Sequence, residues 1–312
     1  MSIDIQITPI SPPLDVGTRI HWDIATQSAI FVDIPNSDVY KYDENTGKVT
    51  KAKVGNEPLA FMFPVEGTNN KFIAGLGRKL VFVDWDGKSS QVSKVETIVE
   101  VEKEEELKGN RLNGAKVDPW GRLWAGTMGA TNSDGSTVRG RGALYSLEKG
   151  KLKKHLGGIG ISNGLAWDTQ KMKMYYIDTL EPCVTQFDIS NSGSLSNKKE
   201  VFSFKANNIG GLPDGLTIDS DGNLWVTAIY GSDLIKFNPE NGSVLKKIVL
   251  PTPQVTSVSF GGKKIDKLFV TTARIPVDGK IPPDPAGTTY SIDLNDEIQH
   301  TIGYSGDRYI IS

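Results

Sequence analysis

The chain has 312 residues, of which 38% are hydrophobic and 23% charged, which suits a packed core and argues against global disorder. Its 35 Lys and Arg residues nearly balance its 37 Asp and Glu residues, so the charge does not favour a nucleic-acid-binding protein. A single cysteine, Cys183, excludes an internal disulfide and cysteine-based zinc sites. The 33 glycines and 16 prolines favour short strands and turns over long helices.

The N-terminal residues do not resemble a targeting segment. They lack the basic stretch and the apolar stretch of a secretory signal. The longest apolar run, Leu59–Val65, is far shorter than the roughly 18 residues that a membrane helix needs. We therefore predict a cytoplasmic protein with no membrane partner and no nucleic-acid partner.

A pattern of short strands recurs along the chain. Each unit has an apolar strand, a second strand after a polar turn, an amphipathic third strand and, in most units, a more polar fourth strand. The first two strands are predicted, in chain order, within residues 18–33, 59–74, 113–126, 163–178, 214–227 and 256–271. The third strands are predicted at residues 39–43, 80–84, 143–147, 184–188, 234–238 and 289–293.

These repeats predict an all-β fold, a six-bladed β-propeller with four antiparallel strands per blade, in which residues 1–312 form a single domain. A β-sandwich would explain strands and turns but not six units of roughly 50 residues. The last blade of a propeller must be closed, because an open sheet edge would remain otherwise. We expect Ile3–Thr8 to pair there, beside the C-terminal residues Arg308–Ile311. The segment 275–288, rich in Pro and Gly, is predicted to be a surface loop, with a flap over the active end as the alternative.

One position in each first strand is a candidate for a functional ring. Equivalent apolar positions are Trp22, Phe63, Val117, Trp167, Ile218 and Phe260, and four residues earlier stand Thr18, Leu59, Asn113, Asn163, Asp214 and Thr256. Because the first strands line the channel, we expect these earlier residues to converge at one end of it. Asn-Gly and Asp-Gly are also ordinary turn dipeptides, but a turn need not recur at a fixed offset. Oxygen ligands without cysteine or clustered histidine favour Ca²⁺, Mg²⁺ or Mn²⁺ over Zn²⁺.

The sequence resembles the family of senescence marker protein (regucalcin), gluconolactonase and luciferin-regenerating enzyme, and is nearest the insect luciferin-regenerating branch. The segments that carry the resemblance are Arg111–Met128, Ser162–Trp167, Met174–Asp178, Pro213–Leu216, Gly222–Val226 and Pro253–Gly262. The resemblance covers nearly the whole chain. It implies a six-bladed propeller that binds one catalytic divalent metal in its channel and hydrolyses lactones or esters.

The resemblance also implies roles for individual residues. Asn163 and Asp214 match the family's metal ligands, and Asn113 and Arg111 match residues that contact metal-bound water and substrate. The family motif Gly-Glu-Gly-Pro-x-Trp is Gly-Thr-Arg-Ile-His-Trp here, so Thr18 replaces the Glu ligand. We therefore expect a metal set of Asn163, Asp214, Asn113 and, weakly, Thr18, with reduced affinity because only one carboxylate remains.

The leading functional hypothesis is a metal-dependent hydrolase of lactones or related esters, with a small-molecule substrate in the channel mouth. One divalent cation, Ca²⁺ first and Mg²⁺, Mn²⁺ or Zn²⁺ as alternatives, would activate water and polarise the carbonyl. Asp214 would take a proton, while Arg111 and Asn113 would orient the substrate and stabilise the oxyanion. The alternative, kept open by Thr18, is a catalytically altered propeller that binds small molecules or is structural. A scaffold for protein interactions is a third alternative.

Overall fold

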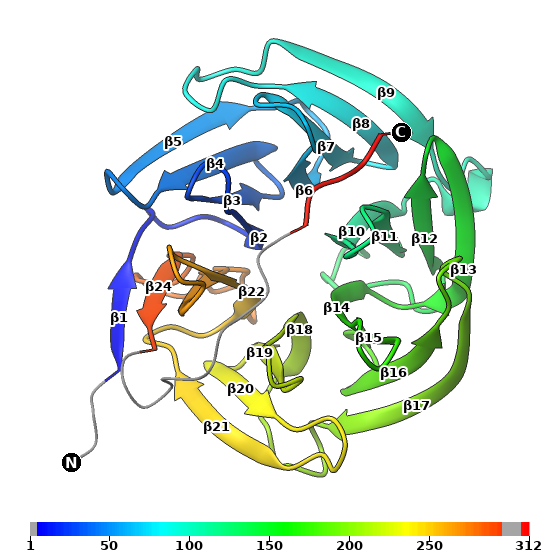
Figure 1. Cartoon of the computed structure of the whole chain (residues 1–312), viewed down its shortest axis with the longest axis vertical. Helices are drawn as coiled ribbons and strands as arrows, with labels where there is room; N and C mark the ends of the chain where they lie inside the picture. The colour runs from blue at the N-terminus through cyan, green and yellow to red at the C-terminus, as the bar shows by residue number, and fades with distance from the viewer. Residues whose placement is uncertain (1–4, 295–306, 312) are drawn as a thin grey trace.

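The computed structural model describes residues 5–294 and 307–311. Six four-stranded antiparallel sheets are arranged in a ring around a central axis, which confirms the predicted six-bladed propeller (Figure 1). Apart from a short 3-10 turn at Glu105–Leu107, the named elements of the described chain are all strands. No helix within the described residues is long and apolar enough to cross a membrane.

The blades follow one another along the chain, each running from an inner to an outer strand. Blade one contains β2 (Gly17–Asp23), β3 (Ser28–Asp33), β4 (Asp38–Asp43) and β5 (Lys48–Lys53). Blade two contains β6 (Leu59–Pro64), β7 (Lys71–Leu76), β8 (Lys79–Asp84) and β9 (Lys94–Glu100). Blade three contains β10 (Arg111–Val117), β11 (Leu123–Met128), β12 (Gly142–Glu148) and β13 (Lys151–Ile159).

The remaining blades repeat this order. Blade four contains β14 (Ser162–Asp168), β15 (Lys173–Asp178), β16 (Cys183–Ile189) and β17 (Leu195–Ser203). Blade five contains β18 (Leu212–Ile218), β19 (Leu224–Ile229), β20 (Asp233–Phe237) and β21 (Val244–Val249). Blade six contains β22 (Val255–Gly261), β23 (Lys267–Thr272), β24 (Tyr290–Asp293) and, as its outer strand, β1 (Gln6–Pro9).

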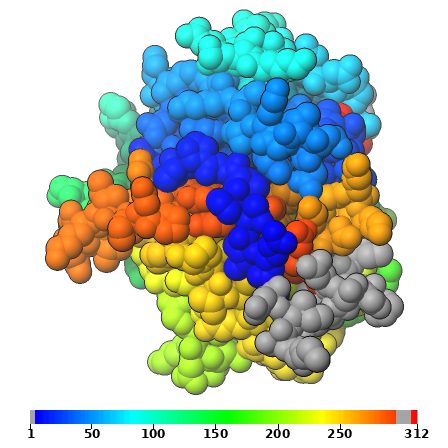
Figure 2. Space-filling model, turned by 90° about the vertical axis from the view of Figure 1, so that its left-hand side faces the viewer, coloured from blue at the N-terminus to red at the C-terminus, as the bar shows by residue number. Residues whose placement is uncertain are grey.

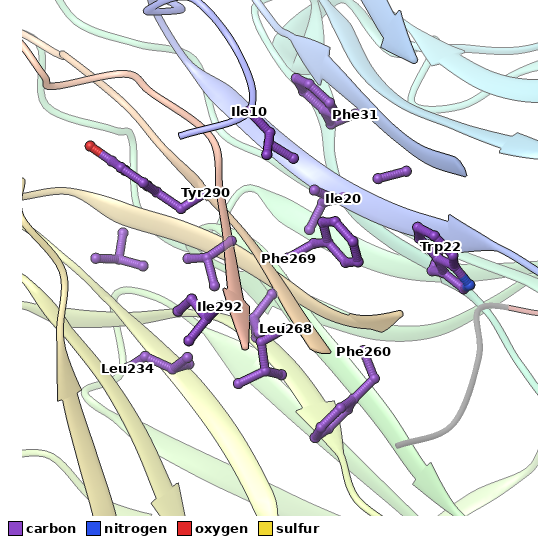
Figure 3. Packing of buried hydrophobic residues seen from close by; sticks show 14 of the residues in the cluster. Ile10, Ile20, Trp22, Phe31, Leu234, Phe260, Leu268, Phe269, Tyr290 and Ile292 are labelled. Carbon is purple, nitrogen blue, oxygen red and sulfur yellow. The ribbon is translucent and has the colours of Figure 1, made fainter. Parts of the chain in front are cut away.

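The core lies between neighbouring blades, where apolar side chains of facing sheets interdigitate. The inner strands β2, β14 and β22 are buried at every position, whereas the outer strand β9 has no buried residue. Figure 3 shows the cluster shared by blades five, six and one, in which Trp22 stacks on Phe269 with ring centroids 4.9 Å apart. Burial of such large rings stabilises each blade against the next and fixes the positions of the inner strands.

The ring is closed by the N-terminal strand. β1 pairs with β24 in antiparallel register, from Gln6 opposite Asp293 to Pro9 opposite Tyr290, as the alternating sequence predicts. Ile3 and Asp4, the first two residues of the predicted strand, lie outside the described residues.

The prediction that Arg308–Ile311 lies beside this strand is wrong. Tyr309 forms a parallel bridge with Val65 of blade two, and its amide donates to the Pro64 carbonyl at 3.0 Å. Arg308 donates to Asp23, the last residue of β2, from both Nε and Nη2. The edge beside β24 is already occupied by β1, so the C-terminal residues instead cover the end of the channel where β2 and β6 finish.

The segment 275–288 projects from the body and is orange in Figure 2. Most of its residues up to Pro285 are exposed. Ile275 alone of this segment lines the cavity described below, which supports the predicted surface loop over the alternative of a flap.

Candidate functional site

The predicted ring residues converge on one cavity. A cavity of about 430 Å³ opens at the channel end where the inner strands begin, and Thr18, Asn113, Asn163, Asp214 and Thr256 all line it. All five residues are at least 94% buried. The equivalent residue of blade two, Leu59, is packed in the apolar core instead. The geometric prediction is therefore confirmed for five of the six blades.

The ring residues Asn113, Asn163 and Asp214 lie within β-bulges, which explains how their polar side chains face the channel. The pairing register shifts after Leu112 in β10, after Ser162 in β14 and after Pro213 in β18. A bulge interrupts strand alternation and redirects a side chain. The Asn-Gly and Asp-Gly dipeptides thus lie inside strands and are not turns.

The glycine after Asn113, Asn163 and Asp214 permits close approach of the neighbouring blade. A Cβ at Gly114 would lie 2.5 Å from the Asn163 carbonyl oxygen, and one at Gly164 would lie 2.7 Å from the Asp214 carbonyl oxygen. Both distances are below van der Waals contact. Glycine at these positions lets the backbones pack closely enough for the ring side chains to touch.

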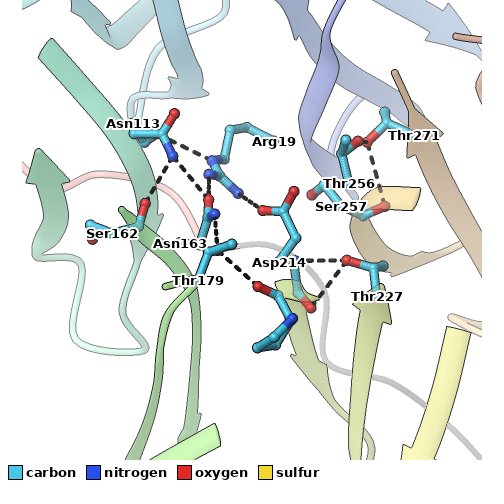
Figure 4. Close-up of polar contacts among 12 residues, drawn as sticks. Arg19, Asn113, Ser162, Asn163, Thr179, Asp214, Thr227, Thr256, Ser257 and Thr271 are labelled. Atoms are coloured by element: carbon cyan, nitrogen blue, oxygen red, sulfur yellow. Dashed lines mark hydrogen bonds and ion pairs between the residues drawn. The ribbon is translucent and has the colours of Figure 1, made fainter. Parts of the chain in front are cut away.

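Blade one has Arg19 at the position where β10, β14 and β18 have glycine. Its backbone has φ of 53°, a left-handed conformation, within the bulge of β2. Figure 4 shows the guanidinium directed into the ring. Nη2 donates to Asn163 Oδ1, Nε donates to the Asn113 carbonyl at 3.2 Å, and Nη1 lies 3.9 Å from Asp214 Oδ1. Arg19 therefore links three blades across the channel axis.

The amide oxygens of the ring are already engaged by protein donors. Asn163 Oδ1 accepts from Arg19 and also from Asn113 Nδ2, at 3.0 Å in the second case. Asn113 Oδ1 accepts from Arg111 Nη1 at 2.8 Å. Asn163 Nδ2 donates to the Thr179 hydroxyl, which in turn donates to the Pro213 carbonyl at 2.8 Å. The ring is therefore a hydrogen-bonded network centred on a guanidinium.

Asp214 and Arg111 have pKa values that differ from the ordinary values of their side chains. Burial raises the pKa of Asp214 to about 7, although the nearby Arg19 charge acts in the opposite direction. Burial and repulsion from Arg19 lower the pKa of Arg111 to about 10. Asp214 Oδ1 has no hydrogen-bond partner among the described residues. Two guanidiniums thus lie close together, with one carboxylate that is easily protonated.

The outer part of the cavity is largely apolar. Its walls include Ile34, Met128, Leu212, Ile229 and Ile275. The hairpin 129–141 between β11 and β12 adds Thr131, Thr137 and Arg139 at the rim. The site therefore has a polar, positively charged floor and an apolar wall.

The residues present do not fit a divalent cation as they are placed. A calcium ion needs six to eight oxygen ligands at about 2.3–2.6 Å, preferably with several carboxylates. The ring has a single carboxylate, Asp214, and the guanidinium of Arg19 contacts the oxygens of Asn163 and Asp214 that would bind the ion. Among the described residues, no group of three or more His, Cys, Asp or Glu side chains could hold a metal. Asp214 Oδ1 accepts no hydrogen bond from the described residues, and the cation nearest to it is the Arg19 guanidinium, 3.9 Å away.

The fold and the cavity define a class of protein, a six-bladed propeller with a polar cavity at one end of its channel. The sequence model of the protein family described as SMP-30/gluconolactonase/LRE-like region matches residues 16–274. The chain therefore belongs to this family. Regucalcin from Bos taurus is 34% identical over 261 residues, covering 83% of each chain, and human regucalcin is 33% identical over 275 residues, covering 87% of this chain and 88% of its own.

Solved structures agree with this assignment. A luciferin-regenerating enzyme is 35% identical, with a TM-score of 0.90 over 98% of this chain and all of its own. A regucalcin from Agrobacterium tumefaciens, described as a calcium-binding protein, has a TM-score of 0.83 at 20% identity over 98% of this chain and 97% of its own, and so shares the fold. The predicted resemblance is confirmed, whereas the cytoplasmic location and the partners stay predictions.

Sequence reasoning found Arg111, Asn113, Asn163, Asp214 and Thr18, and the structure brings all of them to one cavity. Their catalytic and metal-binding roles stay predictions. Sequence reasoning missed Arg19, for which the signal was its alignment with Gly114, Gly164 and Gly215 in the repeat.

Proposed function

We propose that the channel mouth binds a small organic anion, a carboxylate with an apolar body, and does so without a divalent metal. The observation that carries this proposal is the pair of guanidiniums, Arg19 and Arg111, which repel one another on the floor of the cavity. A carboxylate placed between them would relieve this repulsion and accept charge-assisted hydrogen bonds.

The charges along the cavity support an anionic ligand. Three arginines, Arg19, Arg111 and Arg139, line it, against one carboxylate, Asp214. Arg111 donates from Nη1 to the Leu112 carbonyl and to Asn113, and has no carboxylate partner among the described residues. Its Nε and Nη2 groups therefore remain available to a ligand.

The size and walls of the cavity support a small ligand with apolar substituents. A volume of about 430 Å³ lies within the range of roughly 300–1,000 Å³ that is usual for small-molecule pockets. The aliphatic side chains of the outer wall would contact the body of the ligand, while the carboxylate points to the floor. Such a ligand resembles the acid that results when an ester or lactone is hydrolysed.

The test is a calorimetric titration with benzoate and with benzamide, a neutral molecule of the same shape, in buffer that contains EDTA. Benzoate is expected to bind at least tenfold more tightly than benzamide. Affinity for benzoate is also expected to fall about tenfold between pH 6 and pH 8. Above its pKa of about 7 the Asp214 carboxyl is ionised and repels the ligand, whereas below this value it is neutral.

Asp214→Asn is the matched control for the pH effect. This variant should bind benzoate with an affinity that is the same at both pH values. Equal binding of benzoate and benzamide to the wild-type protein would contradict the proposal, and a pH effect that persists in Asp214→Asn would remove Asp214 from the explanation.

Hydrolysis of lactones or esters is a second candidate function, favoured by the raised pKa of Asp214 and by its carboxylate oxygen that has no hydrogen-bond partner among the described residues. A carboxyl with a pKa of about 7 and an unpartnered oxygen is suited to take a proton from an attacking water. Arg111 would stabilise the oxyanion that develops on the carbonyl. Family relatives whose structures are described as gluconolactonases, such as the one from Xanthomonas campestris, make this substrate class reasonable. The metal-dependent form expected from the sequence would require Arg19 to leave the ring.

Hydrolysis is tested with a δ-lactone and an aryl acetate, in EDTA and in CaCl₂. If the second function holds, turnover is expected to be equal in the two buffers, to rise with pH through about 7 and to be lost in Asp214→Asn. Turnover that depends on calcium would instead support the metal-dependent reaction, and no turnover in either buffer would leave anion binding as the function.

A further inference from the structure

Arg19 lies at the centre of the ring, where its guanidinium meets residues of other blades (Figure 4). It contacts Asn113 of β10, Asn163 of β14 and Asp214 of β18, so it joins the inner strands of three blades to its own. Its side chain is 6% exposed, and so is that of Asp214. A buried charge of this kind persists only when it is paired, and Asp214 supplies the pairing.

The charge balance of the ring suits a monovalent cation. The one carboxylate of the ring, Asp214, is paired with the Arg19 guanidinium, whereas a divalent ion on the same ligands would add more positive charge beside Arg111. The guanidinium also donates directed hydrogen bonds to Asn163 Oδ1 and to the backbone carbonyl of Asn113, which a spherical ion would need to break. Thr18 adds a hydroxyl but no charge.

The backbone at residue 19 shows that this arrangement has a conformational cost. Arg19 adopts φ of 53°, in the left-handed region that favours glycine. Glycine occupies the corresponding position of β10, β14 and β18. A glycine at residue 19 would thus relieve the backbone and remove the cation together.

We propose that the Arg19 guanidinium is a built-in cation that replaces a divalent metal in this chain, so that tight calcium binding requires the exchange of both Arg19 and Thr18. This role of Arg19 is the same whatever organic ligand the cavity takes. Arg19 is a positioning residue, because it orders Asn113, Asn163 and Asp214 around the axis of the channel.

The experiment is a calcium titration by calorimetry of four proteins: the wild type, Thr18→Glu, Arg19→Gly and the double variant Thr18→Glu/Arg19→Gly. The double variant gains a carboxylate and loses the guanidinium, so it should bind one calcium ion per chain at least 100-fold more tightly than the wild type. Thr18→Glu alone should not bind, because the introduced carboxylate would pair with Arg19. Arg19→Gly alone should bind weakly, through a single carboxylate.

A second measurement uses the wild-type protein alone and does not depend on the folding of any variant. Its thermal unfolding midpoint should be equal in 1 mM CaCl₂ and in 1 mM EDTA, since a ligand stabilises only the state that binds it. A midpoint raised by calcium, or wild-type binding within tenfold of the double variant, would overturn the inference. A double variant that keeps the wild-type circular dichroism spectrum but does not bind calcium would also overturn it.

Discussion

Replacing Asp118 by alanine is expected to lower the free energy of unfolding by about 3–5 kcal/mol, because the change breaks a fully buried ion pair. Asp118 Oδ2 lies 2.7 Å from Arg122 Nε, and the two side chains are 0% and 2% exposed. The same carboxylate accepts the indole N–H of Trp124 at 2.9 Å and the backbone amides of Trp120 and Arg122. Alanine would leave a buried guanidinium and a buried indole without their acceptor.

Urea unfolding followed by tryptophan fluorescence measures this loss. The double variant Asp118→Ala/Arg122→Met should recover part of it, because the unpaired charge is then absent. Glu96→Ala, which removes an ion pair with Lys94 on the exposed outer strand of blade two, should leave the unfolding midpoint unchanged. Equal effects of Asp118→Ala and Glu96→Ala would show that burial of the Asp118 pair does not matter for stability.

Arg111→Gln is expected to weaken benzoate binding by about 10- to 150-fold. A hydrogen bond to a charged group contributes about 1.5–3 kcal/mol, and each 1.4 kcal/mol corresponds to a factor of ten in the dissociation constant. Arg111 lines the cavity, and only its Nη1 group has described protein acceptors, so its other donors should contact the ligand directly. Glutamine keeps part of the side-chain length but removes the charge.

Calorimetric titration at constant ionic strength gives the dissociation constants. Arg78→Gln is the matched control, since Arg78 pairs with Glu100 in blade two and does not line the cavity. This variant should bind benzoate as the wild type does. An effect of Arg111→Gln below threefold would mean that the ligand carboxylate is not held by this residue.

The fold and most of the ring could be predicted because they depend on repetition. A residue type that recurs at the same offset in successive units must occupy equivalent places around the axis, whatever the local backbone does. Asn113, Asn163 and Asp214 were predictable for this reason, and they lie around one cavity. The resemblance to the family added expected roles for the same residues.

Arg19 could not be placed in the same way, because strand alternation directs consecutive side chains to opposite faces. The bulge of β2, with its left-handed backbone at Arg19, cancels that alternation and turns the guanidinium into the ring. The position of the C-terminal segment was predicted wrongly for a related reason. An alternating pattern shows that a segment can pair, but it does not say which edge is open, and β1 already covers the edge of β24.

Closure of the ring by β1 has a consequence for how the protein is made. The partner of β1, β24, follows it by about 280 residues, which takes roughly 15 s to a minute to synthesise at about 5–20 residues per second. During translation five blades can assemble in order while the earliest strand waits unpaired. The circular architecture is therefore completed only after β24 has been synthesised, and the nascent chain must keep β1 from pairing with a wrong edge until then.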